Sequence, residues 1–196
     1  MAAKTPAPVL LQGRHVRLEP LTLDHVPGLH AALGADEEVF RWLGPVPRTE
    51  QELRDLAAGL LADPGYVAFA VVLQQSGQPV GWTTFLDMAP QDERLEIGWT
   101  WYARAHWRSA VNTEAKLLLL THAFEDLGMG RVQLKTDHLN TRSQQAIARL
   151  GATREGVLRR HRRRADGSWR DSVYFSLLAE EWPAAKARLT ERLERG

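Results

Sequence analysis

The chain has 196 residues, 25 lysines and arginines against 24 aspartates and glutamates, a formal net charge of +1 at pH 7, and no cysteine. A chain of this length buries about 70% of its unfolded surface and needs no disulfide framework. The lack of cysteine excludes thiolate zinc sites, iron–sulfur clusters and a cysteine nucleophile, and the balanced charge argues against a generally electropositive nucleic-acid binder.

Neither a membrane span nor a signal peptide is predicted. The longest apolar run, residues 66–73, is far shorter than the ~20 residues of a membrane helix. The N-terminal segment is short and interrupted by prolines. We therefore expect a cytoplasmic protein without membrane contact. We also expect a flexible N-terminus over residues 1–10 and a single domain over residues 11–196.

The first part of the chain predicts one short strand and two helices. Residues 16–19 alternate as a strand. Thr22 or Asp24 can cap the first helix. Thr49 and Glu52 have the spacing of a capping box and open the second helix.

Three further strands are predicted over residues 66–74, 79–88 and 94–102. Their short links favour antiparallel hairpins. Strict alternation in the third strand would place Leu95, Ile97, Trp99 and Trp101 on one face, and Glu96, Gly98, Thr100 and Tyr102 on the other.

The rest of the chain returns to helices. A helix over 113–127 precedes a strand over 132–136, and a capped helix over 141–150 precedes a hairpin and a C-terminal helix. This order requires a parallel crossover between the strand of Glu96 and the strand of Val132. The fold class is therefore α/β with a mixed, mostly antiparallel sheet.

The link between the 94–102 strand and the following helix is the main candidate anion site. The first amides of a helix are unpaired and its dipole is positive there, so such a turn can hold a pyrophosphate. Most loops of this kind, however, bind nothing. The residues in question are Trp107, Arg108, Ser109, Ala110, Val111, Asn112 and Thr113.

A second helix start follows at Asn140, which is a natural N-cap, with Ser143 in the first turn. Capping alone would explain both residues.

Taken in order, these segments resemble the GNAT superfamily of acyl-CoA-dependent N-acetyltransferases. The resemblance is strongest to its RimJ/RimL-type branch, named for enzymes that acetylate ribosomal-protein N-termini, and it spans about residues 11–182. It implies a sheet flanked by helices and splayed between the fourth and fifth predicted strands. It rests on Leu95-Glu96-Ile97-Gly98-Trp99, the loop and helix start at 107–115, the helix tail at 123–128, Asn140-x-x-Ser143, Leu150-Gly151-Ala152 and Glu181-Trp182.

The resemblance also implies the chemistry. Acetyl-CoA is the cosubstrate, no metal takes part, and a primary amine attacks the thioester directly. Glu96 matches the carboxylate that acts as base, although strand glutamates are usually only solvated. Ser143 matches the residue that protonates the CoA thiolate, and Asn140 matches the one that contacts pantetheine. The amide of Trp101 or Tyr102 matches the donor to the thioester oxygen.

One loop departs from the family pattern. Its glycine positions hold Arg108 and Ala110, with Asn112 at the final small position. Glycine serves there because a backbone without Cβ can approach phosphates closely. Either Arg108 adds a charged contact to the pyrophosphate, or the loop has lost the cofactor. We favour retention because the Asn140-x-x-Ser143 motif is intact.

The sharpest local bias lies between Arg159 and Arg170, where six arginines and one aspartate give a net charge of +5 and leave −4 for the rest. The cluster 159–164 could bind the CoA 3′-phosphate, an acidic protein or ribosomal RNA, or it could simply be a solvated sheet edge. The alternative function is therefore a non-catalytic acyl-CoA-binding or RNA- or ribosome-binding module. Alternation would put Arg159, His161 and Arg163 on one face, and Arg160, Arg162 and Arg164 on the other.

Several features of the acceptor side stay open. The amine is either a protein N-terminus, such as that of a ribosomal protein, or a small molecule, and the loops 40–48 and 103–107 should decide.

Tyr174 is a second acid candidate, with core packing as the alternative. No histidine has metal-ligand spacing. A homodimer is a further expectation.

Overall fold

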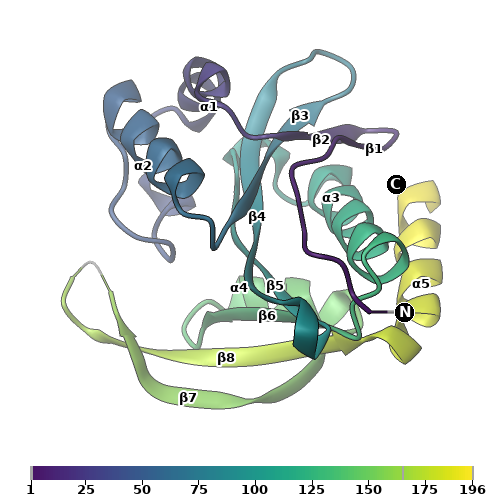
Figure 1. Cartoon of the computed structure of the whole chain (residues 1–196). Helices are drawn as coiled ribbons and strands as arrows, with labels where there is room; N and C mark the ends of the chain where they lie inside the picture. Colours follow the sequence, from purple (N-terminus) through teal and green to yellow (C-terminus); the bar gives the residue numbers. More distant parts are fainter. Residues whose placement is uncertain (1, 165, 196) are drawn as a thin grey trace.

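A single mixed sheet runs through the molecule (Figure 1). The computed structural model describes residues 2–164 and 166–195. Within this part, eight strands follow the spatial order β1-β2-β3-β4-β5-β6-β8-β7. The strands are β1 (Leu11–Gln12), β2 (Val16–Pro20), β3 (Val67–Leu73), β4 (Pro79–Ala89), β5 (Arg94–Tyr102), β6 (Arg131–Asp137), β7 (Thr153–Arg163) and β8 (Trp169–Leu178).

Helices cover both faces of the sheet and create two hydrophobic cores. One core joins α3, α4 and α5 to one face, and the other joins α1 and α2 to the opposite face. The second core includes residues of β3, β4 and the end of β5 but none of β6, β7 or β8. The helices are α1 (Val26–Leu33), α2 (Glu50–Ala62), α3 (Ala110–Thr121), α4 (Thr141–Arg149) and α5 (Trp182–Arg195).

The expected GNAT-like architecture is confirmed. Strands β5 and β6 form the parallel pair, which spans only Arg94–Glu96 against Arg131–Gln133. The other neighbouring strands are antiparallel. Beyond Gln133, β6 continues along β8 while β5 continues along β4, so the two strands separate.

A β-bulge at Trp99 overturns the predicted alternation in β5. Trp99 has a left-handed φ of +48°, and the pairing with β4 shifts between Trp82 and Thr84, opposite Trp101 and Gly98. The bulge inserts one residue and reverses the faces beyond it. Trp101 therefore packs in the core of α1 and α2, and Tyr102 packs in the core of α3 with Leu95 and Ile97.

The helix boundaries also differ slightly from the prediction. The capping box of Thr49 and Glu52 is confirmed, and α1 ends at Gly34. Helix α3 begins at Ala110, before the expected residue 113, because Ser109 caps it. It passes into a π-helical turn, His122–Asp126. In the N-terminal segment, the Lys4 amide donates to the Leu127 carbonyl at 2.8 Å, and the flexibility expected for residues 1–10 stays a prediction.

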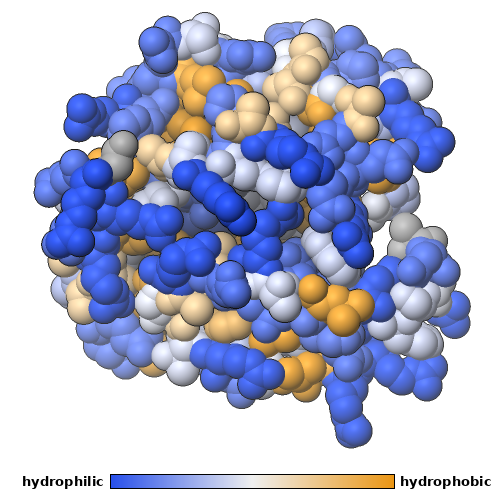
Figure 2. Space-filling view, turned by 180° about the vertical axis from the view of Figure 1, so that it is seen from behind, coloured by the Kyte–Doolittle hydropathy of each residue, from blue (hydrophilic) through white to orange (hydrophobic). Residues whose placement is uncertain are grey.

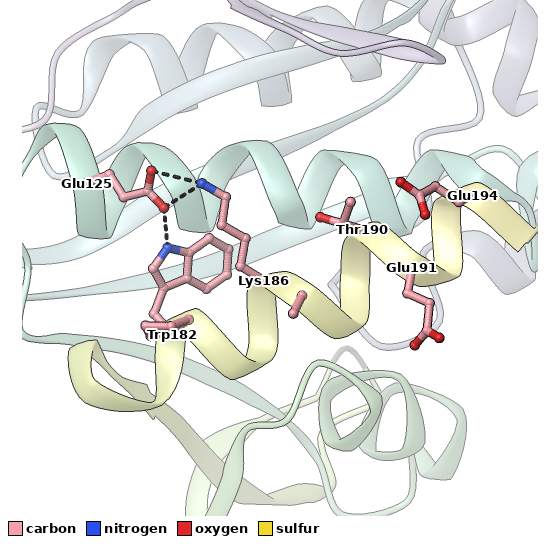
Figure 3. A pocket seen from close by; sticks show the side chains of 8 residues that line it. Glu125, Trp182, Lys186, Thr190, Glu191 and Glu194 are labelled. Carbon is pink, nitrogen blue, oxygen red and sulfur yellow. Dashed lines mark hydrogen bonds and ion pairs between the residues drawn. The ribbon is translucent and has the colours of Figure 1, made fainter.

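The C-terminal helix is held by two residues of the resemblance motifs. Glu125 accepts hydrogen bonds from the Trp182 indole at 2.6 Å and from Lys186 at 2.7 Å (Figure 3). Figure 3 shows these groups at one end of a groove between α3 and α5. These three groups satisfy one another's hydrogen bonds, so their role at the groove is to hold α5 against α3.

Glu114 ties α3 to the first hairpin. Its carboxylate is 5% exposed and accepts hydrogen bonds from the amides of Arg14, His15 and Val16 at 2.8, 2.6 and 2.7 Å. Gly13 makes this approach possible, since a Cβ there would lie 2.5 Å from the Glu114 carboxyl carbon. The β1–β2 turn is therefore closed by a side chain about 100 residues away in sequence.

We expect Glu114→Gln to lower the free energy of unfolding by about 2–3 kcal/mol, because the buried amides lose a charged acceptor. Urea unfolding at pH 7 measures this loss. The control is Glu191→Gln, which removes an exposed ion pair with Arg195 and should change stability by less than about 0.5 kcal/mol. Equal effects of the two substitutions would contradict the anchoring role.

Candidate functional site

The separation of β5 from β6 exposes backbone groups at the end of β5. The Ala103 amide donates to the Val80 carbonyl at 2.8 Å. Since hydrogen-bonded pairs alternate in an antiparallel ladder, the amide and carbonyl of Tyr102 point away from β4, toward the gap. The Tyr102 carbonyl accepts from the Trp107 indole at 2.8 Å. Of the two candidate amides, Tyr102 faces the gap and Trp101 faces β4.

The start of α3 lies at the same end of the sheet. Ser109 Oγ accepts from the Val111 amide at 3.3 Å, whereas the amides of Ala110 and Asn112 have no partner among the described residues. These free donors and the helix dipole suit an anion. Arg108 has a left-handed φ of +61°, so this position keeps a glycine-like conformation although it carries a side chain.

Trp107 connects this loop to the start of α4. Two guanidinium groups lie over its ring, with Arg142 at 3.6 Å and Arg104 at 4.9 Å from the ring centroid. Arg104 also pairs with Asp36, which lowers the pKa of that carboxyl group. Burial, together with the charges of Arg104 and Arg108, lowers the pKa of Arg142. Positive charge therefore gathers around the two helix starts.

The predicted cap of α4 is confirmed. Asn140 Oδ1 accepts from the Ser143 amide at 3.1 Å, which occupies this oxygen. The Ser143 hydroxyl has no hydrogen bond among the described residues and is partly exposed. The structure thus brings Asn140 and Ser143 to the same region as Trp107.

The other side of the gap is a polar surface on β5, β6 and β8. We call it the floor; it consists of Glu96, Gln133, Lys135, Ser172 and Tyr174, which register and alternation place on one face. Helices α1 and α2 cover the sheet as far as the end of β5, and they leave this face of β6 and β8 uncovered (Figure 1). On the floor, Gln133, Lys135 and Tyr174 are partly exposed, whereas Glu96 and Ser172 are buried.

Glu96 is the centre of the floor. It is 2% exposed, and its Oε2 accepts from Gln133 Nε2 and Lys135 Nζ, both at 2.8 Å. The predicted catalytic carboxylate is therefore an ion-paired group at the last parallel residue of β5. Neither partner was singled out from the sequence, because a lysine and a glutamine on a strand carry no motif.

Tyr174 lies on the floor and not in the core, so its packing alternative is wrong. It is half-buried, with Lys135 Nζ 5.9 Å from its ring centroid and the His161 ring 5.8 Å away. Burial and the charge of Glu96 raise the pKa of Tyr174. His161 bonds the Ser172 hydroxyl at 2.9 Å, and burial and the charge of Lys135 lower the pKa of its imidazole, which favours the neutral form.

The arginine cluster does not follow strict alternation. Arg160 has a left-handed φ of +50°, and both Arg160 and Arg163 stack on the Trp169 ring, 4.6 and 4.8 Å from its centroid. They share one face, contrary to the prediction, because of a bulge in β7. Arg164 instead bonds the buried carboxylate of Asp137 at 2.6 and 2.9 Å.

The hairpin of β7 and β8 projects from the body of the molecule (Figure 1). Seen from behind, the surface is mostly hydrophilic, with hydrophobic residues in small separate areas (Figure 2). Single exposed apolar side chains of this kind need no partner.

Aromatic side chains join the α1–α2 connection to the end of β5. Phe40 packs against Trp82 and Trp101, with ring centroids 6.3 and 5.3 Å away. The indole nitrogens of Trp82 and Trp101 are buried without a partner among the described residues. Trp101 therefore supports the cleft through packing, and its side chain is not placed to contact a cofactor at α3.

Lys116 is buried beneath the bulge of β5. It is 6% exposed, and its Nζ donates to Thr100 Oγ1 at 3.1 Å, which in turn lies 2.7 Å from Thr83 Oγ1. Burial lowers the pKa of Lys116 to about 7. The sequence does not reveal this buried lysine, because a lysine within an apolar helix gives no sign that its side chain points inward.

The described residues contain no cluster of three or more histidines and carboxylates placed to hold a metal. They also contain no helix with the length and hydropathy of a membrane span.

Comparisons with known proteins point to one family. The model of the family described as "Acetyltransferase (GNAT) domain" matches residues 15–153. The chain is 30% identical over 139 residues to "Putative ribosomal N-acetyltransferase YdaF" of Bacillus subtilis (strain 168), covering 71% of this chain and 68% of that protein.

Solved structures agree. A "putative acetyltransferase" from T. thermophilus is 47% identical, with a TM-score of 0.88 over 96% of this chain and 98% of that one. "Mycobacterium smegmatis RimJ in complex with CoA-disulfide" is 24% identical, with a TM-score of 0.78 over 97% of this chain and 95% of that one, and shows the shared fold.

Lys116→Met should make stability less dependent on pH. Between pH 7 and about 10 the unfolded lysine holds a proton that the folded one lacks, so the wild type gains stability as pH rises. The variant should lose this slope, about 1.4 kcal/mol per pH unit, and should be more stable than the wild type at pH 7. Urea unfolding at pH 7, 8.5 and 10 measures it. Parallel pH profiles would show that Lys116 stays charged in the fold.

Proposed function

Because this chain belongs to the GNAT acetyltransferase family, we propose that it is an acetyl-CoA-dependent N-acetyltransferase that transfers the acetyl group directly to a primary amine. The observation that carries the proposal is the gap between β5 and β6. It places the free amides at the start of α3 on one side and the Glu96 carboxylate on the other. Acetyl-CoA, which carries a diphosphate and a thioester, can thus approach from one face of the sheet, and the amine can approach from the other.

The donor set fits the phosphates of acetyl-CoA. The amides of Ala110 and Asn112 and the guanidinium groups of Arg108 and Arg142 supply hydrogen bonds and positive charge. The left-handed backbone at Arg108 supports retention of the cofactor in a loop without its glycines. Asn140, Ser143 and Trp107 would border the pantetheine. RimJ, which shares this fold, was solved in complex with CoA-disulfide, and this supports binding of a CoA group.

Bound acetyl-CoA supplies the thioester: the amine nitrogen bonds to the acetyl carbon, the C–S bond breaks, and one proton must pass from the nitrogen to the thiolate. Glu96 is proposed to accept the amine proton, directly or through water. The hydrogen bonds from Gln133 and Lys135 orient the carboxylate. The Tyr102 amide would donate to the thioester oxygen. Ser143, whose hydroxyl is free, would return a proton to the thiolate.

The acceptor is proposed to be a protein N-terminus or a small-molecule amine. The relative named as a ribosomal N-acetyltransferase favours a protein substrate. The exposed arginines 159, 160, 162 and 163 could contact ribosomal RNA beside such a substrate. They are also the basis of the alternative, a non-catalytic binding module.

Two measurements separate these functions. Acetyl-CoA should raise the melting temperature by linkage, and a panel of N-terminal peptides and small amines should contain at least one acceptor that releases CoA. The absence of both a thermal shift at millimolar acetyl-CoA and any acetylation, together with salt-sensitive RNA binding, would favour the binding module.

Glu96→Gln should lower kcat by about 100-fold or more near neutral pH, because the variant lacks a base. Its affinity for acetyl-CoA should stay within about twofold of the wild type, since the phosphate donors are on other elements. The control is Glu155→Gln on β7, which is also ion-paired, through Arg131. Turnover of Glu96→Gln equal to that of the wild type across pH 6–9, a window around an α-amino pKa of about 7.7–8.0, would remove Glu96 from the mechanism.

A further inference from the structure

Arg170 follows the floor along β8, and no hydrogen-bond acceptor for it is found among the described residues. It shares a face of β8 with Ser172 and Tyr174, because the residues alternate and the bulge of this hairpin lies in β7. Its Nε is buried without a hydrogen-bond partner among the described residues. Buried donors are normally paired in a working structure.

The two carboxylates whose charges act on Arg170 are each paired with another cation. Glu96 is already held by Lys135 and Gln133. Asp137 is held by Arg164 through two hydrogen bonds. Arg170 is thus half-buried and forms no ion pair with either of these acids among the described residues.

Other arginines of the same hairpin differ from Arg170. Arg160 and Arg163 are exposed and stack on Trp169, and Arg164 has Asp137. Arg170 alone among these four combines a buried, unpaired Nε with a position on the same face as the floor.

Arg170 also stands apart from the arginines at the start of α3. The charged groups that act on Arg142 include Arg104 and Arg108, whereas those that act on Arg170 are Asp137, Arg162, Glu96 and Tyr174. Arg170 therefore lies on the amine side of the gap and not on the phosphate side.

We propose that Arg170 binds a carboxylate of the acceptor, so that the preferred substrates are primary amines with a carboxylate close to the amino group. This inference rests on the proposed acetyl transfer. The planar guanidinium matches a carboxylate with two parallel hydrogen bonds. Such a binding site beside Glu96 would orient the amine toward the base. The carboxylate can come from a free amino acid or from an acidic side chain next to a peptide N-terminus.

Two matched acceptor pairs test the proposal and separate the two sources. One pair consists of peptides that begin Ala-Asp or Ala-Asn and are otherwise identical, and the other is alanine against alaninamide. In at least one pair, the wild type should use the acid with about tenfold higher kcat/KM, mainly through KM. Arg170→Met should reduce that preference to within about twofold and leave the amide substrate and the KM for acetyl-CoA unchanged.

Arg170→Lys keeps the positive charge but loses the planar guanidinium that donates two parallel hydrogen bonds, so it should retain an intermediate preference for the acid over the amide. The matched control is Arg154→Met, an exposed arginine on the opposite face of the same hairpin, which should keep the full preference. Circular dichroism and the thermal shift with acetyl-CoA report whether each variant folds.

Equal use of acid and amide by the wild type in both pairs would overturn the proposal, whatever the variants do. So would a preference that survives in Arg170→Met or in Arg170→Lys at full strength, or an effect confined to the KM for acetyl-CoA. Lack of acetylation of every amine would instead refute the proposed transfer reaction, and the inference with it.

Discussion

The contact of Glu96 with Lys135 and Gln133 joins the two halves of the sheet at the point where they part. Glu96 belongs to the last parallel residue pair, and both of its partners come from β6. The two bonds keep β5 and β6 together up to this residue while each strand follows a different neighbour beyond it. A charged side chain buried here needs such partners, because desolvation without them would be prohibitive. The same arrangement gives the gap its defined position.

The parallel pair also determines where the helix starts lie. A parallel connection requires a crossover, and here α3 provides it, so the start of α3 must be close to the end of β5. The free amides at the start of α3 therefore face the gap between β5 and β6, and Glu96 lies where this gap begins. The bulge at Trp99 adds to this geometry by deciding which core each residue enters: Trp101 packs with α1 and α2, and Tyr102 packs with α3. One strand can thus line both proposed sites, that of the amine and that of the cofactor.

Several buried polar groups reduce the stability of this fold because they have few or no hydrogen-bond partners. Lys116 is buried with only a threonine hydroxyl as partner, and the indoles of Trp82 and Trp101 lack acceptors among the described residues. They surround the end of β5, where the bulge interrupts regular pairing. Each unpaired buried donor typically costs about 1–3 kcal/mol, so this region carries strain that the rest of the structure offsets. The anchoring of α3 by Glu114 contributes to that support.

The sequence by itself determined the element order, the caps at Thr49 and Asn140, the parallel crossover and the family resemblance, because these depend on residues close together in the chain. Only the tertiary structure decided which side chains meet. Lys135 lies 39 residues from Glu96, and the left-handed turns at Trp99, Arg108 and Arg160 follow from packing and carry no local signal. A single inserted residue reverses every face beyond it, so alternation alone could not assign Trp101 and Tyr102 to their cores. The lack of a partner for Arg170 depends on contacts between strands that the sequence does not show.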